Sequence, residues 1–182
     1  MVRWTTDACA PLAKVPQDVE PIWRRLAARS VEIGYLIPTV RMNDDAAIRL
    51  VADGQVIQPV SDRNSRYVFT IAANVRSVSL LSRFCIPSDK MIPGQRDTRR
   101  LGVRVNWIAI RSNDREVVLP ADHPFMRDGW NGVERDGRTM WRWTDGAAIL
   151  PWETITGSAV VTVYCSPAGQ YPVYHDKTRL PA

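Results

Sequence analysis

Lysine, histidine and paired cysteines are scarce in this 182-residue chain. Arginine provides 21 of the 24 basic residues, and there are only two histidines and three cysteines. Because His123 and His175 lie far apart and no Cys-x-x-Cys pair occurs, we expect no metal site and no other cofactor. Cys85 and Cys165 lie in apolar stretches and are expected to be buried thiols, with one disulfide plus a free thiol as the alternative.

Three further absences limit the function. No apolar run approaches the roughly 18 residues that a membrane-spanning helix needs, and the N-terminus has no charged-then-apolar leader, so neither a membrane span nor an export signal is expected within this chain. No Gly-x-Ser-x-Gly nucleophile elbow and no glycine-rich phosphate loop occur. The composition, 45% hydrophobic and 24% charged, is typical of a soluble globular protein that needs no metal or disulfide to fold.

The net charge of +5 is a weak pointer to anionic partners, because the basic residues are scattered along the chain. The densest group contains Arg96, Arg99 and Arg100. These arginines suit an acidic polysaccharide or a phosphate, but a solvated loop in which Asp97 and Asp89 are their partners is the plainer interpretation. We therefore expect no nucleic-acid binding.

Residues 19–34 are predicted to form the one clear helix, because their apolar side chains fall on one stripe at three- and four-residue steps. Asp18 is the expected N-terminal cap and Gly34 the expected stop. The stripe consists of Val19, Ile22, Trp23, Leu26 and Ile33. It needs a packing surface, so residues 1–37 are interpreted as an extension and helix that pack on a sandwich domain of residues 38–182.

After residue 38 the hydrophobic period changes from 3.6 to 2, which predicts strands. The Asp53-Gly54 dipeptide is expected to join residues 46–52 and 55–58 in a hairpin. Residues 101–111 are expected to place alternate side chains on one face, namely Leu101, Val103, Val105, Trp107 and Ala109. Other strands are predicted at residues 66–72, 75–86, 116–119, 158–165 and 171–175, and long loops at residues 87–100 and 120–137. This pattern predicts a mostly β fold, an antiparallel β-sandwich of jelly-roll type with one N-terminal α-helix.

Three of the seven tryptophans gather late in the chain. Trp141 and Trp143 alternate with Arg142, so on a strand they share one face and the arginine points the other way. Asp145-Gly146 is a tight-turn dipeptide, and residues 147–152 are expected to return beside the tryptophans as the second strand of a hairpin.

Indole rings stack on the apolar faces of sugars, and polar side chains around them bind the hydroxyl groups. The candidate ligand-binding residues on this basis are Trp130, Asn131, Glu134, Trp141, Arg142 and Asp145. Trp130 lies in the predicted loop and is expected to be the most exposed of the three tryptophans. In the alternative interpretation Trp141 and Trp143 fill the sandwich core, and Arg142 pairs with Asp145 or Glu134 on the outside.

An enzymatic alternative depends on the second long loop. Asp122 and His123, with Glu134 nearby in sequence, are candidates for a histidine base or a metal site. A His-Pro turn whose carboxylates cap loops or pair with arginines accounts for the same residues. The alternative function is therefore a hydrolase or lyase that uses Asp122, His123 and Glu134.

Several segments resemble the region that follows the core of bacterial hedgehog/intein (Hint) domain proteins. The resemblance extends through residues 7–12, 19–34, 50–54, 81–83, 97–103, 129–130 and 141–146. The Leu-Gly-Val and Gly-Trp…Arg-Trp patterns are also similar to β-sandwich modules attached to bacterial glycosyltransferases. The resemblance implies an accessory β-sandwich in a cell-surface or extracellular setting, beside a neighbouring domain of a longer parent protein.

The chain departs from Hint cores at the residues that perform their chemistry. Such cores need a nucleophilic Cys or Ser at their start and a Thr-x-x-His element, and this chain contains neither. The resemblance therefore implies no self-processing. The favoured function is a non-catalytic recognition module for carbohydrate or cell-surface material, and a purely structural domain of a longer Hint-type protein is the remaining alternative.

Overall fold

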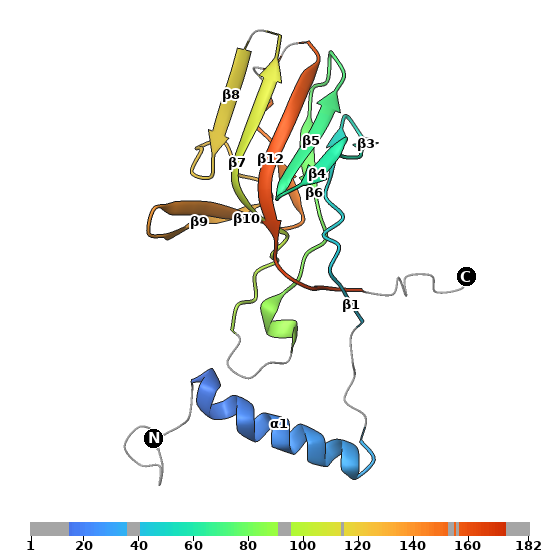
Figure 1. Ribbon diagram of the computed structural model, residues 1–182, viewed down its shortest axis with the longest axis vertical. Coiled ribbons are helices and arrows are strands. Elements are labelled where there is room, and N and C mark those ends of the chain that lie inside the picture. Colours follow the sequence, from blue (N-terminus) through green and yellow to red (C-terminus); the bar gives the residue numbers. More distant parts are fainter. Residues whose placement is uncertain are drawn as a thin grey trace, which may run out of the picture. The chain divides into compact units, whose positions relative to one another are not determined.

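A computed structural model describes residues 15–35, 41–90, 96–113, 115–152, 155 and 157–173. The internal contacts of the chain divide it into two units. One comprises Met1–Val40 with Ile86–Thr98, and the other comprises Arg41–Cys85 with Arg99–Ala182. The first unit contains the helix α1 (Pro16–Glu32) and a short 3-10 turn, η1 (Pro87–Lys90), while the strands belong to the second (Figure 1).

The helix α1 begins earlier than its capping signal predicts. Val15 is its N-terminal cap residue and makes no side-chain cap bond, while Asp18 lies in the first turn. The prediction that Asp18 caps the helix is therefore wrong. Pro16 explains the earlier start, because proline is preset for the first helical position and its missing N–H has no partner to lose there.

The predicted stop at Gly34 is confirmed. Gly34 has φ = 90°, and its N–H donates to the carbonyl of Val31 at 3.0 Å. The N–H of Tyr35 donates to the carbonyl of Ser30, also at 3.0 Å. These two bonds are the Schellman arrangement, in which a glycine in the left-handed conformation satisfies the last carbonyls of a helix.

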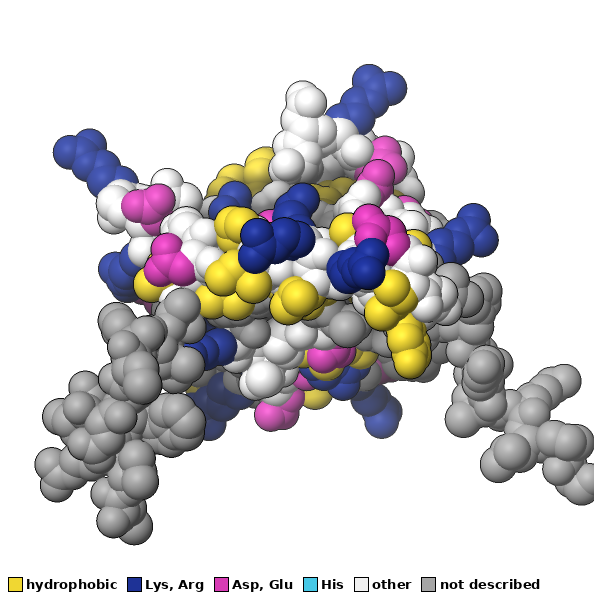
Figure 2. Space-filling view, turned by 90° about the horizontal axis from the view of Figure 1, so that it is seen from below, with side chains coloured by type: hydrophobic (Ala, Val, Ile, Leu, Met, Phe, Trp, Pro, Cys, Tyr) yellow, Lys and Arg dark blue, Asp and Glu magenta, His cyan; other side chains and the backbone are white. Residues whose placement is uncertain are grey.

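Part of the apolar stripe of α1 is exposed. The side chains of Ile22, Leu26 and Ile33 are each at least half exposed. Figure 2 looks onto this helix, and hydrophobic side chains lie there beside basic and acidic ones. The packing of α1 on the sandwich stays a prediction.

The strands form an antiparallel β-sandwich, so the predicted mostly β fold with one N-terminal helix is confirmed for the described residues. The larger sheet has seven strands, in the order β4 (Ser61–Arg63), β5 (Arg66–Ile71), β12 (Ala159–Pro167), β7 (Val103–Ser112), β10 (Thr139–Thr144) and β9 (Trp130–Asp136), with β8 (Arg115–Pro120) also paired to β7. The smaller sheet has the order β11 (Ala147–Ile149), β6 (Val78–Leu81), β2 (Arg49–Ala52) and β3 (Gln55–Ile57). A separate ribbon joins β1 (Met42–Asn43) to β13 (Tyr171–Pro172).

Both sheets supply side chains to one hydrophobic core. Leu50 and Leu80 of the smaller sheet and Phe69, Ile110 and Val161 of the larger sheet are fully buried in the same cluster. Burial of such side chains stabilises a fold by roughly 1.5–3 kcal/mol each before the entropy of ordering is subtracted. The predicted alternation in residues 46–52 and 66–72 therefore has its apolar side facing this core.

The predicted hairpin at Asp53-Gly54 is confirmed. Asp53 has φ = 45° and Gly54 has φ = 83°, which is the pattern of a type I′ turn, and β2 pairs with β3 across it. Backbone N–H groups of Arg76 and Ser77 donate to the Asp53 carboxylate. These hydrogen bonds hold the pKa of Asp53 below its ordinary value.

Strand β7 contains a bulge that the sequence pattern did not reveal. Cys165 of β12 lies opposite Val105, and the preceding residue, Tyr164, lies opposite Trp107, so Asn106 has no partner on β12. An extra residue of this kind shifts the alternation of the strand by one position. The prediction that Trp107 and Ala109 share a face with Val105 is therefore wrong.

The burial of the residues on either side confirms the shift. Val103 and Val105 are fully buried before the bulge, and Ile108 and Ile110 are fully buried after it. The bulge thus keeps all four aliphatic side chains in the core. It also places Trp107 on the opposite side of the sheet.

The prediction of a hairpin that turns at Asp145-Gly146 is wrong, although the tryptophan strand itself exists as β10. Strand β10 pairs with β9, which lies inside the segment predicted to be a loop, and not with residues 147–152. Asp145 and Gly146 instead lead the chain from one sheet to the other, where β11 pairs with β6. A side chain at position 129 would collide with the backbone of Ala147, so a glycine is required beside this crossing.

Candidate functional site

The outer face of the seven-stranded sheet carries aromatic side chains. Residues directly opposite each other in antiparallel strands point to the same side, so register decides which face a side chain takes. Val103 and Val105 point into the core, which places Arg104 between them on the outer face. Trp143 lies opposite Arg104 and is therefore on the outer face as well.

Trp107 and Tyr164 form the first aromatic pair on this face. They are cross-strand partners on β7 and β12, and their ring centroids lie 3.6 Å apart with 18° between the ring planes. Both are partly exposed. The two rings therefore present a stacked, flat surface to the outside of the sheet.

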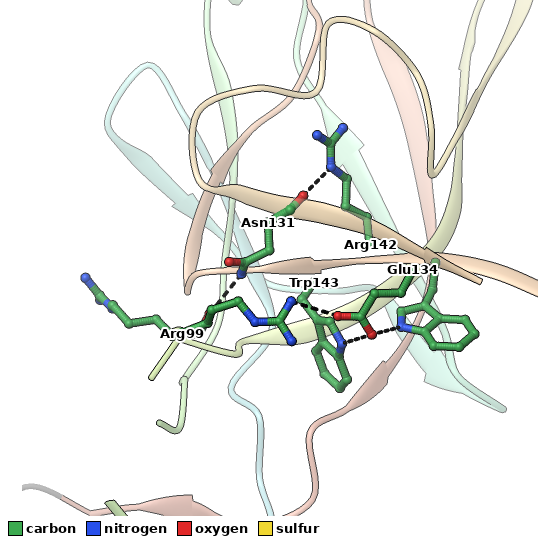
Figure 3. A network of polar contacts seen from close by, with 7 residues as sticks. Arg99, Asn131, Glu134, Arg142 and Trp143 are labelled. Atoms are coloured by element: carbon green, nitrogen blue, oxygen red, sulfur yellow. Dashed lines mark hydrogen bonds and ion pairs between the residues drawn. The ribbon is translucent and has the colours of Figure 1, made fainter. Parts of the chain in front are cut away.

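Trp141 and Trp143 form the second pair, and Glu134 holds them in place (Figure 3). The indole Nε1 of Trp141 donates to Glu134 Oε2 at 3.0 Å, and that of Trp143 donates to the same oxygen at 3.3 Å. The bonds of both indoles to Glu134 confirm the prediction that these tryptophans share one face, and Arg142 points the other way, to the carbonyl of Asn131. Because both N–H groups are occupied, the ring faces are the part left for a ligand.

Arg104 lies between the two aromatic pairs. Its guanidinium carbon is 5.1 Å from the centroid of the Trp141 ring, and its Nε donates to Ser166 Oγ at 3.2 Å. We call the set of Trp107, Tyr164, Trp141, Trp143 and Arg104 the outer aromatic face. It crosses strands β10, β7 and β12, a width of about 10 Å at ordinary strand spacing.

Glu134 is ionised by its surroundings. Partial burial raises the pKa of its carboxyl, but hydrogen bonds from Arg99 and Trp141, the charge of Arg99 and the hydrogen bond from Trp143 outweigh burial. The pKa therefore lies below its ordinary value. With Arg99 Nη1 at 2.8 Å and two indole donors, this carboxylate braces the aromatic face and is poorly placed to serve as a free acceptor for a ligand.

Trp130 is not the exposed tryptophan that was predicted. Its side chain is 8% exposed, it belongs to the core cluster, and its Nε1 donates to the carbonyl of Ile149 at 2.8 Å. The prediction failed because Trp130 begins strand β9 and does not lie in a loop. Its partner across the strands is Thr144, which is fully buried.

The side chains of the remaining predicted ligand residues form hydrogen bonds with backbone groups. Asn131 Nδ2 donates to the carbonyl of Arg100, and Arg142 Nε donates to the carbonyl of Asn131 (Figure 3). Asp145 Oδ1 accepts from the N–H of Ala147. Of the six predicted residues, the structure therefore brings only Glu134 and Trp141 together on the outer aromatic face.

The residues of the enzymatic alternative do not converge. Glu134 points to the outer face, whereas its neighbour Arg135 points to the other side of β9, as alternation requires. Asp122 pairs with Arg135, at 3.3 Å from its Nη2. The two carboxylates are thus held by side chains on opposite sides of one strand, and His123 lines a separate pocket.

Among the described residues, two arginines of the predicted loop 87–100 contact other side chains of the protein, and two thiols are buried. Arg99 pairs with Glu134, and the guanidinium of Arg100 lies 3.8 Å above the ring of Phe84. Cys85 and Cys165 are buried, as predicted, and burial raises the pKa of the Cys165 thiol to about 12. A thiol with so high a pKa is unreactive at neutral pH.

The described part of the chain shows neither a metal cluster nor a membrane-spanning helix. It contains no group of three or more His, Cys, Asp or Glu side chains arranged to hold a metal ion. No helix in the same residues is long and apolar enough to cross a membrane.

The sequence patterns did not predict Trp107 and Tyr164 as site residues, because their position depends on the bulge in β7. Trp107 was predicted to share a face with Val103 and Val105, and Tyr164 was not among the predicted site residues. The signal that was present is the Asp136-Gly137 dipeptide, a turn signal that would have located strand β9 and the correct partner of β10. No protein-family model, no curated protein and no solved structure matches the chain.

Proposed function

We propose that this chain is a non-catalytic recognition module that binds carbohydrate on the outer aromatic face. The observation that carries the proposal is the row of partly exposed aromatic rings on adjacent strands, with Arg104 between them. Flat indole and phenol faces stack on the apolar faces of sugar rings, while a guanidinium binds hydroxyl or carboxylate groups.

The rigidity of this face supports the proposal. Glu134 fixes Trp141 and Trp143 through their N–H groups, and Trp143 also packs against the core cluster. Trp107 is fixed by its stacking on Tyr164. Rings that are already ordered lose little conformational entropy when a ligand binds, so more of the contact energy appears as affinity.

The setting of the module is part of the proposal. The resemblance to the region after Hint cores and to glycosyltransferase-attached modules favours a cell-surface or extracellular role beside a neighbouring domain. The absence of a Hint nucleophile from the sequence fits a passenger domain that performs no self-processing.

A glycan array with wild type and two variants tests the proposal. We expect Trp107→Ala and Tyr164→Ala each to weaken binding of the best glycan by at least about tenfold, as truncation of a central aromatic contact does. Phe125→Ala is the matched control, because Phe125 is an exposed aromatic residue outside the outer aromatic face.

Two results would contradict the proposal. One is the absence of binding to any glycan by the folded wild type, which would favour a structural domain. The other is a glycan that binds Trp107→Ala and Tyr164→Ala as tightly as wild type, since the ligand would then use another surface. Isothermal titration calorimetry with the array hit gives the affinities for this comparison.

A further inference from the structure

A concave site lies between the edge strands β8 and β11 of the two sheets. It is a pocket of about 600 Å³, lined by Val117 and Leu119 of β8 on one side and by Ile149 of β11 with Trp152 on the other. Strand β8 pairs only with β7, and β11 ends the order of its sheet, so among the described strands both are edges. The volume falls within the range of pockets that hold small molecules.

The pocket has an apolar floor and an apolar rim. Leu119 and Trp152 are almost fully buried and form the floor, whereas Phe125 is 66% exposed and Ile149 is 47% exposed at the rim. The Nε1 of Trp152 donates to the carbonyl of Val75, so its indole offers the pocket only apolar ring surface. Large apolar side chains exposed around a concavity are typical of ligand sites.

Four ionisable side chains line the same pocket. Arg76 and Arg127 line it with Asp128, which makes the lining basic by one charge. Arg127 donates through Nε to the carbonyl of Pro124, which is the one hydrogen bond of this side chain among the described residues, so the end of its guanidinium can serve a ligand. The Nδ1 atom of His123 is buried without a hydrogen-bond partner in the described structure.

This pocket and the outer aromatic face lie on opposite sides of the larger sheet, as the side chains of β8 show. Leu119 lies opposite Ile108, which is fully buried, so it points inward, while Val118 between Val117 and Leu119 points outward. The two sites therefore use opposite sides of the same sheet. A ligand in one makes no use of the residues of the other.

We propose that this pocket binds a small, mainly apolar molecule that carries a carboxylate. The apolar body fills the space between Phe125, Leu119 and Trp152, and the carboxylate meets Arg127 at the rim. The excess of positive charge in the lining selects an acid over an amine, and the apolar walls select a ring or branched chain over a sugar. This site is independent of the proposed carbohydrate function.

Titration with 2-naphthoate and with uncharged 2-naphthamide, followed by NMR of labelled methyl groups, tests the proposal. We expect 2-naphthoate to shift the methyl signals of Val117, Leu119 and Ile149, with the exposed Val118 as the internal control. Phe125→Ala should weaken 2-naphthoate by roughly tenfold, the loss expected for one well-buried apolar contact. Because Phe125 is mostly exposed, this variant should keep the wild-type fold.

The charge is tested separately. Arg127→Gln should weaken 2-naphthoate by about fivefold to tenfold and leave 2-naphthamide unchanged. Arg111→Gln removes an exposed arginine that does not line the pocket and should have no effect on either compound. Trp107→Ala should likewise leave 2-naphthoate binding unchanged, which separates this test from that of the carbohydrate proposal.

Three outcomes would overturn the proposal. They are the absence of methyl shifts at the pocket residues, shifts confined to residues beside Trp107 and Tyr164, and equal affinity of wild type and Phe125→Ala. Equal weakening of both compounds by Arg127→Gln would overturn the assignment of a carboxylate ligand.

Discussion

The two faces of the seven-stranded sheet differ in the kind of side chain they carry. The inner face carries mainly aliphatic side chains, with Val105, Ile108 and Val161 fully buried. The outer face carries partly exposed aromatic rings and arginine, such as Trp107 beside Arg104. One layer of backbone therefore separates the core side chains from those of the proposed binding face, and the Asn106 bulge keeps Trp107 on the outer side.

Deletion of Asn106 should break this separation and have the largest effect. Without the extra residue, either the bulge moves or Ile108 and Ile110 turn outward and Trp107 turns inward. Loss of burial of two isoleucines predicts a decrease of about 3–6 kcal/mol in the free energy of unfolding. Urea unfolding measures it.

Asn106→Ala is the matched control for the deletion. It keeps the number of residues and removes only the hydrogen bond from Asn106 Nδ2 to the carbonyl of Met140. The expected cost is about 1 kcal/mol. A deletion variant no less stable than Asn106→Ala would show that the bulge does not determine the two faces.

Replacing a tryptophan by alanine should lower the free energy of unfolding by different amounts on the two faces. Trp130→Ala should lower the free energy of unfolding by about 3–5 kcal/mol, because it leaves a cavity in the core and an unpaired carbonyl at Ile149. Trp107→Ala should cost only about 1–2 kcal/mol, since half-exposed rings bury less area and lose mainly the stacking on Tyr164. Equal costs in thermal or urea unfolding would contradict the assignment of the two faces.

Glu134→Gln should have a smaller, pH-dependent effect. The pKa of Glu134 is lowered in the folded state, so its contribution is complete above the ordinary carboxyl pKa and is lost as the pH falls through the folded-state value. At pH 7 we expect a cost of at most about 1 kcal/mol, because Arg99 is 43% exposed and solvent screens the pair.

The pH profile is the decisive measurement for Glu134. The difference in unfolding free energy between wild type and Glu134→Gln should shrink as the pH falls below about 4, where the carboxylate becomes protonated. A difference that stays constant between pH 7 and pH 3 would show that charge on Glu134 does not stabilise the aromatic face.

Arg104→Gln is expected to have the smallest effect on stability. It removes a guanidinium that lies 5.1 Å from the Trp141 ring and that bonds Ser166. The expected loss is about 0.5–1 kcal/mol, the range for a cation–π contact at a partly exposed position. The same variant should weaken glycan binding measurably, and unchanged binding would remove Arg104 from the proposed site.

Local sequence patterns correctly predicted those features that depend only on residues close together in the chain. The hairpin at Asp53-Gly54, the stop at Gly34 and the shared face of Trp141 and Trp143 follow from turn chemistry and alternation, and the structure confirms each. The pairing of β10 was predicted wrongly. Asp136-Gly137 and Asp145-Gly146 are equally good turn signals, and the choice between them depends on which strand finds a partner.

The amino-acid sequence by itself determined the fold class, because two-residue alternation and turn dipeptides act over a few residues and permit little besides an antiparallel sandwich. Only the tertiary structure decided which side of the sheet Trp107 and Trp130 occupy. A bulge reverses the facing of the side chains that follow it in its own strand, and a crossing between sheets changes which strand is the partner; both are set by long-range pairing. The site therefore arises from register, which no local pattern in the chain contains.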